Sequence, residues 1–253
     1  VIGLLGVVVA MQILKPEPIK DLLNSFNAEQ KAKAIYSIDD HKKEDWHFFP
    51  STMFKREGSP IKEMNPRQRE FVHSVLKTFL SKSGYEKTVE IMELENVLRS
   101  FGQDSVIRDA EKYFISFYGN PMTDDIWSMS FEGHHISLNF TVSGDEIVAS
   151  PRFLGANPAM IPEGPRKGDR TLDEEEDLGF DLINSMDSQQ QQKAIFQEES
   201  FKEIVSFNLP EISPIKPQGI RYLELNHEQQ KHVSYTQLTL PMPHTVETYV
   251  VAV

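Results

Sequence analysis

Residues 131–142 read FEGHHISLNFTV, and this stretch decides the fold class. From residue 136 onward apolar and polar side chains alternate, which is the pattern of a β-strand with one face on the core. The core face is expected to carry Ile136, Leu138, Phe140 and Val142. Residues 113–118, 127–142 and 146–153 are all rich in aromatic and β-branched residues. The sequence therefore predicts a short antiparallel β-meander across residues 113–154.

Helical sequence lies on both sides of the predicted meander, and part of it is repeated. Residues 22–36 (LLNSFNAEQKAKAIY) align without gaps on residues 182–196 (LINSMDSQQQQKAIF). The two copies, and a shorter echo after each, place Asn or Asp three residues before Gln: Asn27/Gln30, Asn65/Gln68, Asp187/Gln190 and Asn226/Gln229. This spacing predicts a capping box, in which both side chains satisfy backbone N–H groups at a helix start. We therefore expect the glutamines to be structural, and the fold to be α+β with the meander packed against two similar helical units.

The predicted elements define a single α+β domain over residues 17–232. Its parts are a helical unit (17–101), the β-meander (113–154) and a second helical unit (171–232) that we expect to be truncated. The second unit opens with an acidic run, which favours the start of a helix. Within this run, Thr171-x-x-Glu174 predicts a further capping box.

The two ends of the chain differ in composition from the rest. Residues 1–10 (VIGLLGVVVA) are uncharged and end in the small-residue pattern of a signal-peptide cleavage site, so they predict a signal-peptide remnant and a secreted or periplasmic protein. A buried N-terminal strand is the alternative. Residues 233–253 contain no Lys or Arg, and VSYTQLTLP resembles translated sequencing-adapter read-through. We expect a poorly packed, non-native tail there, with a genuine edge strand as the alternative.

Composition excludes several classes of function. The chain has 253 residues with 26 Lys and Arg against 38 Asp and Glu, which gives a net charge of −12. This charge argues against nucleic acids and anionic membrane surfaces as main partners. The absence of cysteine excludes disulfides, thiolate nucleophiles and iron–sulfur clusters. The apolar run at residues 1–10 is too short to span a bilayer, so no membrane span is expected in the mature protein.

The adjacent histidines carry most of the potential chemistry. In a regular strand, His134 continues the apolar row and is expected to be buried, whereas His135 shares the polar face of Ser137 and Asn139. The two rings then point in opposite directions and cannot both bind one metal ion. A bulge at Gly133 would change this, because glycine within a strand often marks one.

Three interpretations of this segment remain open. In the first, Glu132 and His134 form a general acid/base pair or half of a metal site. In the second, His135, Ser137 and Asn139 line a polar pocket. In the third, the histidine is structural and is held by backbone hydrogen bonds where a helix meets the sheet.

A basic loop follows the meander. Its four cationic residues are Arg152, Arg166, Lys167 and Arg170. They offer a place for a carboxylate or phosphate near the histidines, and we expect Arg170 or Asn157 to reach toward His135. The alternative is that these cations neutralise the acidic residues 173–177.

The pattern of these residues resembles a known family. The shared features are Tyr113, Gly119-x-Pro121, Trp127-x-x-x-Phe131-Glu-Gly-His-His-x-Ser-Leu-Asn139, Phe153-x-Gly-Ala-Asn-Pro158 and Gly168-x-Arg170. They resemble the domain of unknown function family 3500, over about residues 22–232. The resemblance implies a secreted bacterial protein of unknown activity whose chain continues past His232. It also singles out Trp127, together with the polar motif residues, as a candidate ligand contact.

The leading functional hypothesis is a secreted or periplasmic protein with a histidine-based site. In it, His135, His134 and Glu132 support metal-assisted or acid/base hydrolysis, with a divalent metal as the candidate cofactor. The ligand-binding candidates are Ser137, Asn139, Asn157, Arg170 and Trp127. The alternative is a non-catalytic binding module of the cell envelope that recognises a small polar or anionic ligand.

Overall fold

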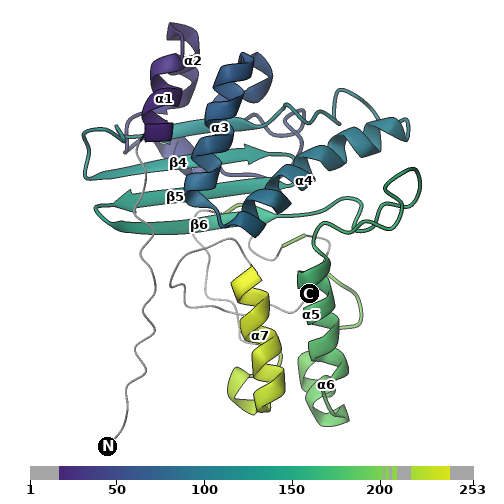
Figure 1. Cartoon of the computed structure of the whole chain (residues 1–253). Helices are drawn as coiled ribbons and strands as arrows, with labels where there is room; N and C mark the ends of the chain where they lie inside the picture. The colour runs from purple at the N-terminus through teal and green to yellow at the C-terminus, as the bar shows by residue number, and fades with distance from the viewer. Residues whose placement is uncertain (1–16, 202, 205–206, 210–217, 240–253) are drawn as a thin grey trace, which may run out of the picture.

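A computed structural model describes residues 17–201, 203–204, 207–209 and 218–239 (Figure 1). The predicted signal-peptide remnant (1–10) and residues 240–253 of the predicted tail lie outside the described residues. Among the residues that are described, no helix is both long and apolar enough to cross a membrane.

The predicted meander forms the centre of a six-stranded sheet. Its strands are β3 (Phe114–Tyr118), β4 (Ile126–Gly133), β5 (Ile136–Ser143) and β6 (Glu146–Leu154), each antiparallel to the next. Two short strands that the alternation did not predict extend the sheet: β1 (Ile35–Tyr36) is parallel to β3, and β2 (Ser59–Pro60) is antiparallel to it. Because β4 occupies one edge of β3, both short strands pair with the other edge.

Helices cover one face of this sheet. The elements of the first helical unit are α1 (Glu17–Ser25), α2 (Ala28–Ala34), α3 (Pro66–Phe79) and α4 (Lys82–Ser100), with short 3₁₀ turns at His41–Glu44 and Ile61–Glu63. Figure 1 shows α3 and α4 lying across the front of the sheet. The predicted core row of β5 (Ile136, Leu138, Phe140 and Val142) is buried in one cluster with side chains of α1, α3 and α4. The α+β prediction is therefore confirmed.

The predicted capping boxes organise the helical repeat. Reciprocal hydrogen bonds between the Asn or Asp side chain and the Gln side chain and backbone are present at all four predicted sites. The glutamines also bond to one another in pairs, Gln30 with Gln68 and Gln190 with Gln229. Each pair joins the start of one helix to the start of another, which confirms that the repeated glutamines are structural.

The second helical unit reproduces the first without a sheet of its own among the described residues. Its elements are α5 (Asp173–Asn184), α6 (Ser188–Ala194), a 3₁₀ turn (Tyr222–Glu224) and α7 (His227–Thr239). The helix, break, helix shape of residues 182–196 matches that of residues 22–36, as the alignment predicts. Lys87 of α4 joins the unit to the first by ion pairs with Glu174 and Glu175.

Two details of the second unit correct the sequence predictions. The capping box predicted at Thr171 is wrong: α5 begins one residue later than that box requires, Leu172 is its N-cap, and no side chain caps it. The prediction that residues from Val233 onward lack buried contacts is wrong at Val233 itself. This side chain is 5% exposed and packs with Met186, Ala194 and Leu225 in a small separate core.

Candidate functional site

The histidine pair lies in a tight turn and not on a strand. Strand β4 ends at Gly133 and β5 begins at Ile136, so His134 and His135 are the two residues that reverse the chain. Their rings stack with centroids 4.0 Å apart and planes 27° apart. The prediction that the rings point in opposite directions is therefore wrong, because strand alternation does not continue through a reversal of the chain. His135 adopts the left-handed backbone region, with φ of 64°.

Backbone hydrogen bonds from three segments fix this turn. The N–H of His135 donates to the carbonyl of Phe48 at 2.8 Å, and the N–H of Gly155 donates to the carbonyl of His135 at 2.9 Å. The Tyr113 hydroxyl donates to the carbonyl of His134 at 2.9 Å. The Tyr113 ring also explains Gly133, since a Cβ there would lie 2.3 Å from the ring carbon Cδ1. The turn is thus held rigidly where β4 ends and β5 begins.

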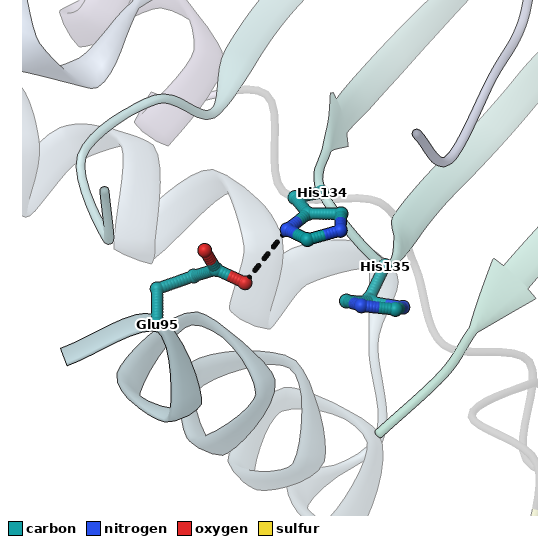
Figure 2. A group of neighbouring side chains, drawn as sticks. All are labelled: Glu95, His134 and His135. Carbon is teal, nitrogen blue, oxygen red and sulfur yellow. Dashed lines mark ion pairs between the residues drawn. The ribbon is translucent and has the colours of Figure 1, made fainter. Parts of the chain in front are cut away.

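Glu95 of α4 completes the cluster (Figure 2). Its side chain is 1% exposed, and its Oε1 lies 2.8 Å from Nδ1 of His134. Glu95 is not among the site residues predicted from the sequence, although the apolar pattern of its helix contains a signal for it. Glu95 lies four residues after Ile91 and three before Leu98, so it falls on the apolar stripe of its helix, where a carboxylate is out of place.

Arg108 compensates the buried charge of Glu95. Its Nη1 lies 3.2 Å from Oε1 of Glu95 and also 3.2 Å from Nδ1 of His134. Nδ1 of an imidazole can donate a hydrogen bond to Glu95 or accept one from Arg108, but it cannot do both at once. Glu95, Arg108 and His134 therefore meet at one point, and no single set of hydrogen positions satisfies all three contacts.

Two further atoms of the cluster are buried without a partner among the described residues: Nε2 of His135 and Oε2 of Glu95. Buried polar atoms are nearly always hydrogen-bonded, so an unpaired imidazole nitrogen and an unpaired carboxylate oxygen in one cluster are unusual. Burial lowers the pKa of His135 to about 3, helped by the nearby His134 and Arg108, so its ring is neutral at pH 7. A neutral imidazole is the form that binds metal ions.

The donor set of this cluster suits a transition metal. One ligand atom from each of Glu95, His134 and His135 lies within 4.8 Å of the other two. Two imidazoles and one carboxylate are typical ligands of Zn²⁺ and of non-haem Fe²⁺. Metal–ligand bonds of about 2.0–2.2 Å place ligand atoms roughly 3–4 Å apart. Side-chain movements of about an ångström would therefore close the set around one ion.

Residues 16–239 match the model of a protein family described as "Protein of unknown function (DUF3500)". The chain belongs to this family. The match covers most of the chain, including both helical units, the sheet and the histidine turn. No curated protein and no solved structure matches it.

The polar DUF3500 motif residues divide into two groups. Glu132, Ser137 and Asn139 do not join the histidines. Instead, the Ser137 hydroxyl donates to Glu132 Oε1 at 2.8 Å, and Nδ2 of Asn139 donates to Ser137 Oγ at 3.0 Å. Burial raises the pKa of Glu132 to about 7, against the opposing effects of Arg56 and the hydrogen bonds that the carboxylate accepts. Neither predicted grouping, Glu132 with His134 or His135 with Ser137 and Asn139, is present.

The remaining predicted ligand contacts lie elsewhere. Trp127 is 3% exposed and packs edge-on against Phe79 in the core, so it does not line the histidine cluster. Arg170 forms ion pairs with Glu176 and Asp177 rather than reaching toward His135. This contact favours the alternative in which the DUF3500 basic loop neutralises the acidic helix start. Asn157 lies two residues beyond Gly155, which bonds the histidine turn.

A polar hollow of about 520 Å³ is separate from the predicted pocket at His135. Its walls are Lys62, Asn96, Arg99, Ser105, Asp109, Ala110 and Glu111. None of these is a site residue predicted from the sequence, but Asn96 and Asp109 are the sequence neighbours of Glu95 and Arg108. The hollow therefore lies beside the part of α4 and the loop that supply the buried charges of the cluster.

Proposed function

We propose that Glu95, His134 and His135 bind one divalent transition-metal ion, and that the bound ion supports hydrolysis by activating water. The observation that carries this proposal is the unpartnered Nε2 of His135, buried next to the Glu95–His134 contact. A metal ion would satisfy this nitrogen, the second oxygen of Glu95 and the competing demands on Nδ1 of His134 at once.

Three protein ligands are the usual number in a catalytic zinc site, which leaves one position for water or substrate. A bound metal supplies a Lewis acid and lowers the pKa of its water toward about 7. The protein's own contribution is a rigid turn that fixes both histidines and a helix that fixes Glu95. His134 keeps 13% of its side chain exposed, so the cluster is reached from solvent on that side.

Arg108 is expected to oppose metal binding. Its guanidinium contacts the same Oε1 and Nδ1 atoms that a metal would use, and it places a positive charge there. The apo and metal-bound forms therefore differ in which cation balances Glu95. Replacing Arg108 by Gln is expected to tighten metal binding, whereas loss of either histidine is expected to weaken it.

The experiment is metal titration of the purified, chelator-treated chain with Zn²⁺ and with Co²⁺, whose absorption spectrum reports its coordination. We expect one ion per chain, with His135→Ala weakening binding by at least about 100-fold, because even loss of a group that only supports a ligand weakens binding by about 10–100-fold. The matched control is His73→Ala, because His73 is partly buried on α3 and bonds only Tyr85 among the contacts described. Unchanged binding in His135→Ala, or no binding in the wild type, would contradict the proposal.

Export from the cytoplasm is part of the same proposal, supported by the uncharged apolar residues 1–10 and their cleavage-site pattern. Cell fractionation of the expressed protein tests it. The competing proposal, a binding module for an anionic ligand, has less support because Arg166 and Arg170 are already paired with carboxylates.

A further inference from the structure

The first helical unit uses two short segments to hold an edge of the sheet. One is β1, whose Ile35 and Tyr36 pair with Phe117 and Tyr118 of β3. The other is the segment around β2, which pairs with the start of β3 and continues it through the N–H of Ile61, a donor to the carbonyl of Tyr113. The two segments together form a clasp on β3, at the end of α2 and just before α3.

The second unit contains the same clasp, and none of the described strands lies in it. Ile195 and Phe196 correspond to Ile35 and Tyr36, 160 positions earlier, and residues 220–222 correspond to 59–61, 161 positions earlier. The segments belong to no strand in the described residues. Tyr222 is 47% exposed, whereas its counterpart Ile61 is 4% exposed, and Ile195 is 53% exposed against 39% for its counterpart Ile35.

The clasp in the second unit is already held in shape. Gln190 pairs with Gln229 as Gln30 pairs with Gln68, with matching distances of 2.9 and 3.1 Å between the amides. Lys193 bonds Glu224 at 2.6 Å, as Lys33 bonds Glu63 at 2.6 Å. The contacts that set the two segments beside each other are thus the same with and without a sheet.

The first helices of the two units, α1 and α5, also differ in burial, because only α1 packs on the sheet. In the first unit α1 buries Ile19 and Leu22 completely, whereas α5 buries none of its residues. Leu182, which aligns with the fully buried Leu22, is only partly buried, and Phe180 of α5, which aligns with Lys20, is 58% exposed. Exposed apolar side chains on a structured surface are typical of an interaction site.

We propose that the second unit docks a second antiparallel sheet, from a partner polypeptide whose free edge has the apolar strand chemistry of β3. The first copy of the repeat identifies the occupant, because there the same clasp encloses β3. The chain's own β3 cannot fill both clasps, since β4 occupies one of its edges and β1 and β2 occupy the other. This inference is independent of the proposed metal site.

The first test extends the chain with its own sheet. In the extended variant, a second copy of residues 80–155 replaces residues 240–253, and hydrogen exchange is followed by mass spectrometry. We expect the amides around residues 193–198 and 219–224 to exchange at least about tenfold more slowly than in the unextended chain. The matched control carries Asp at the added copies of Ile115 and Phe117, which should abolish this protection.

The second test does not depend on the extended variant folding. A soluble, lysine-flanked peptide of residues 113–119 (YFISFYG) is added to the unmodified chain. Protection confined to residues 193–198 and 219–224 supports the proposal. Protection confined to β6, whose outer edge is unpaired in the described sheet, would overturn it, as would no protection in either test. Protection that appears without peptide and rises with protein concentration would identify a second copy of the chain as the occupant, and would also overturn it.

Discussion

The two helical units share a repeated sequence motif but differ in what they pack against. Both form a helix, a break and a second helix, both use Asx–Gln capping boxes, and both join two helix starts through a glutamine pair. Only the first lies on the sheet, and only there are the apolar residues of its first helix fully buried. The comparison shows that capping fixes the local shape, whereas burial, and with it most of the stability, comes from the sheet.

The candidate metal site lies in the part of the molecule formed by the first helical unit and the sheet. Its histidines close the β4–β5 hairpin, and Glu95 lies on α4, which follows α3. Within the described residues, α7 is not followed by a counterpart of α4. The described second unit therefore repeats the supporting scaffold of the site but none of its ligands.

The largest expected difference between the units is in core truncation. Leu22 is 0% exposed, and Leu22→Ala is expected to lower the free energy of unfolding by about 2–5 kcal/mol, through lost burial and the cavity left behind. The aligned change, Leu182→Ala, removes a side chain that is only partly buried, and is expected to cost less than about 1 kcal/mol. Urea denaturation of both variants measures this. Equal costs would show that the second unit is as well packed as the first.

Protonation of His47 in acid should destabilise the sheet-bearing half selectively. His47 is 2% exposed, and its Nδ1 accepts hydrogen bonds from the N–H groups of Phe48 and Phe49. Burial, together with nearby Arg56, lowers the pKa of His47 to about 4. Below about pH 6.5 the unfolded chain therefore gains a proton that the folded chain does not, so stability is full above pH 7 and is lost as the pH falls toward 4.

The contribution of His47 to this loss, measured as the difference between the wild type and His47→Asn, is expected to reach about 1–3 kcal/mol at pH 4.5 and to appear in hydrogen exchange of the sheet but not of α5 and α7. His47→Asn is the control, because an amide oxygen can accept the same two backbone hydrogen bonds without titrating. If the variant keeps the full acid sensitivity of the wild type, His47 is not its source.

Sequence patterns predicted what is local in this molecule. The capping boxes, the repeat and the alternating core row of β5 were all predicted, because each depends on neighbours within a few residues. The clasping strands β1 and β2 were not predicted, since two-residue strands have no periodicity and depend on β3. Glu95 and Arg108 were missed for a similar reason: they lie 39 and 26 residues before His134, and only the folded chain brings them together.

The orientation of the histidines was mispredicted by a single assumption. The prediction assumes that side chains continue to alternate between the two faces of one strand from Glu132 to His135, whereas the strand ends at Gly133. A two-residue reversal normally shows glycine or asparagine within the turn, and here His135 takes the left-handed position itself. Its backbone hydrogen bonds to Phe48 and Gly155 maintain that conformation, and neither partner is visible in the local sequence.

The smallest expected difference concerns the glutamine pairs, which are chemically alike in the two units. Gln68→Ala leaves the amide of Gln30 and the carbonyl of Ser25 without their buried partner, and is expected to cost about 1–3 kcal/mol. Gln229→Ala breaks the same contacts with Gln190 and Ser185. Gln190 is more exposed than Gln30, so water can replace part of what is lost and the cost should be below about 1 kcal/mol. Thermal melts of the two variants and of the double variant measure both costs. If the two changes cost the same, the two glutamine pairs are equally shielded from water. The difference in burial between the two units is then confined to the apolar faces of α1 and α5.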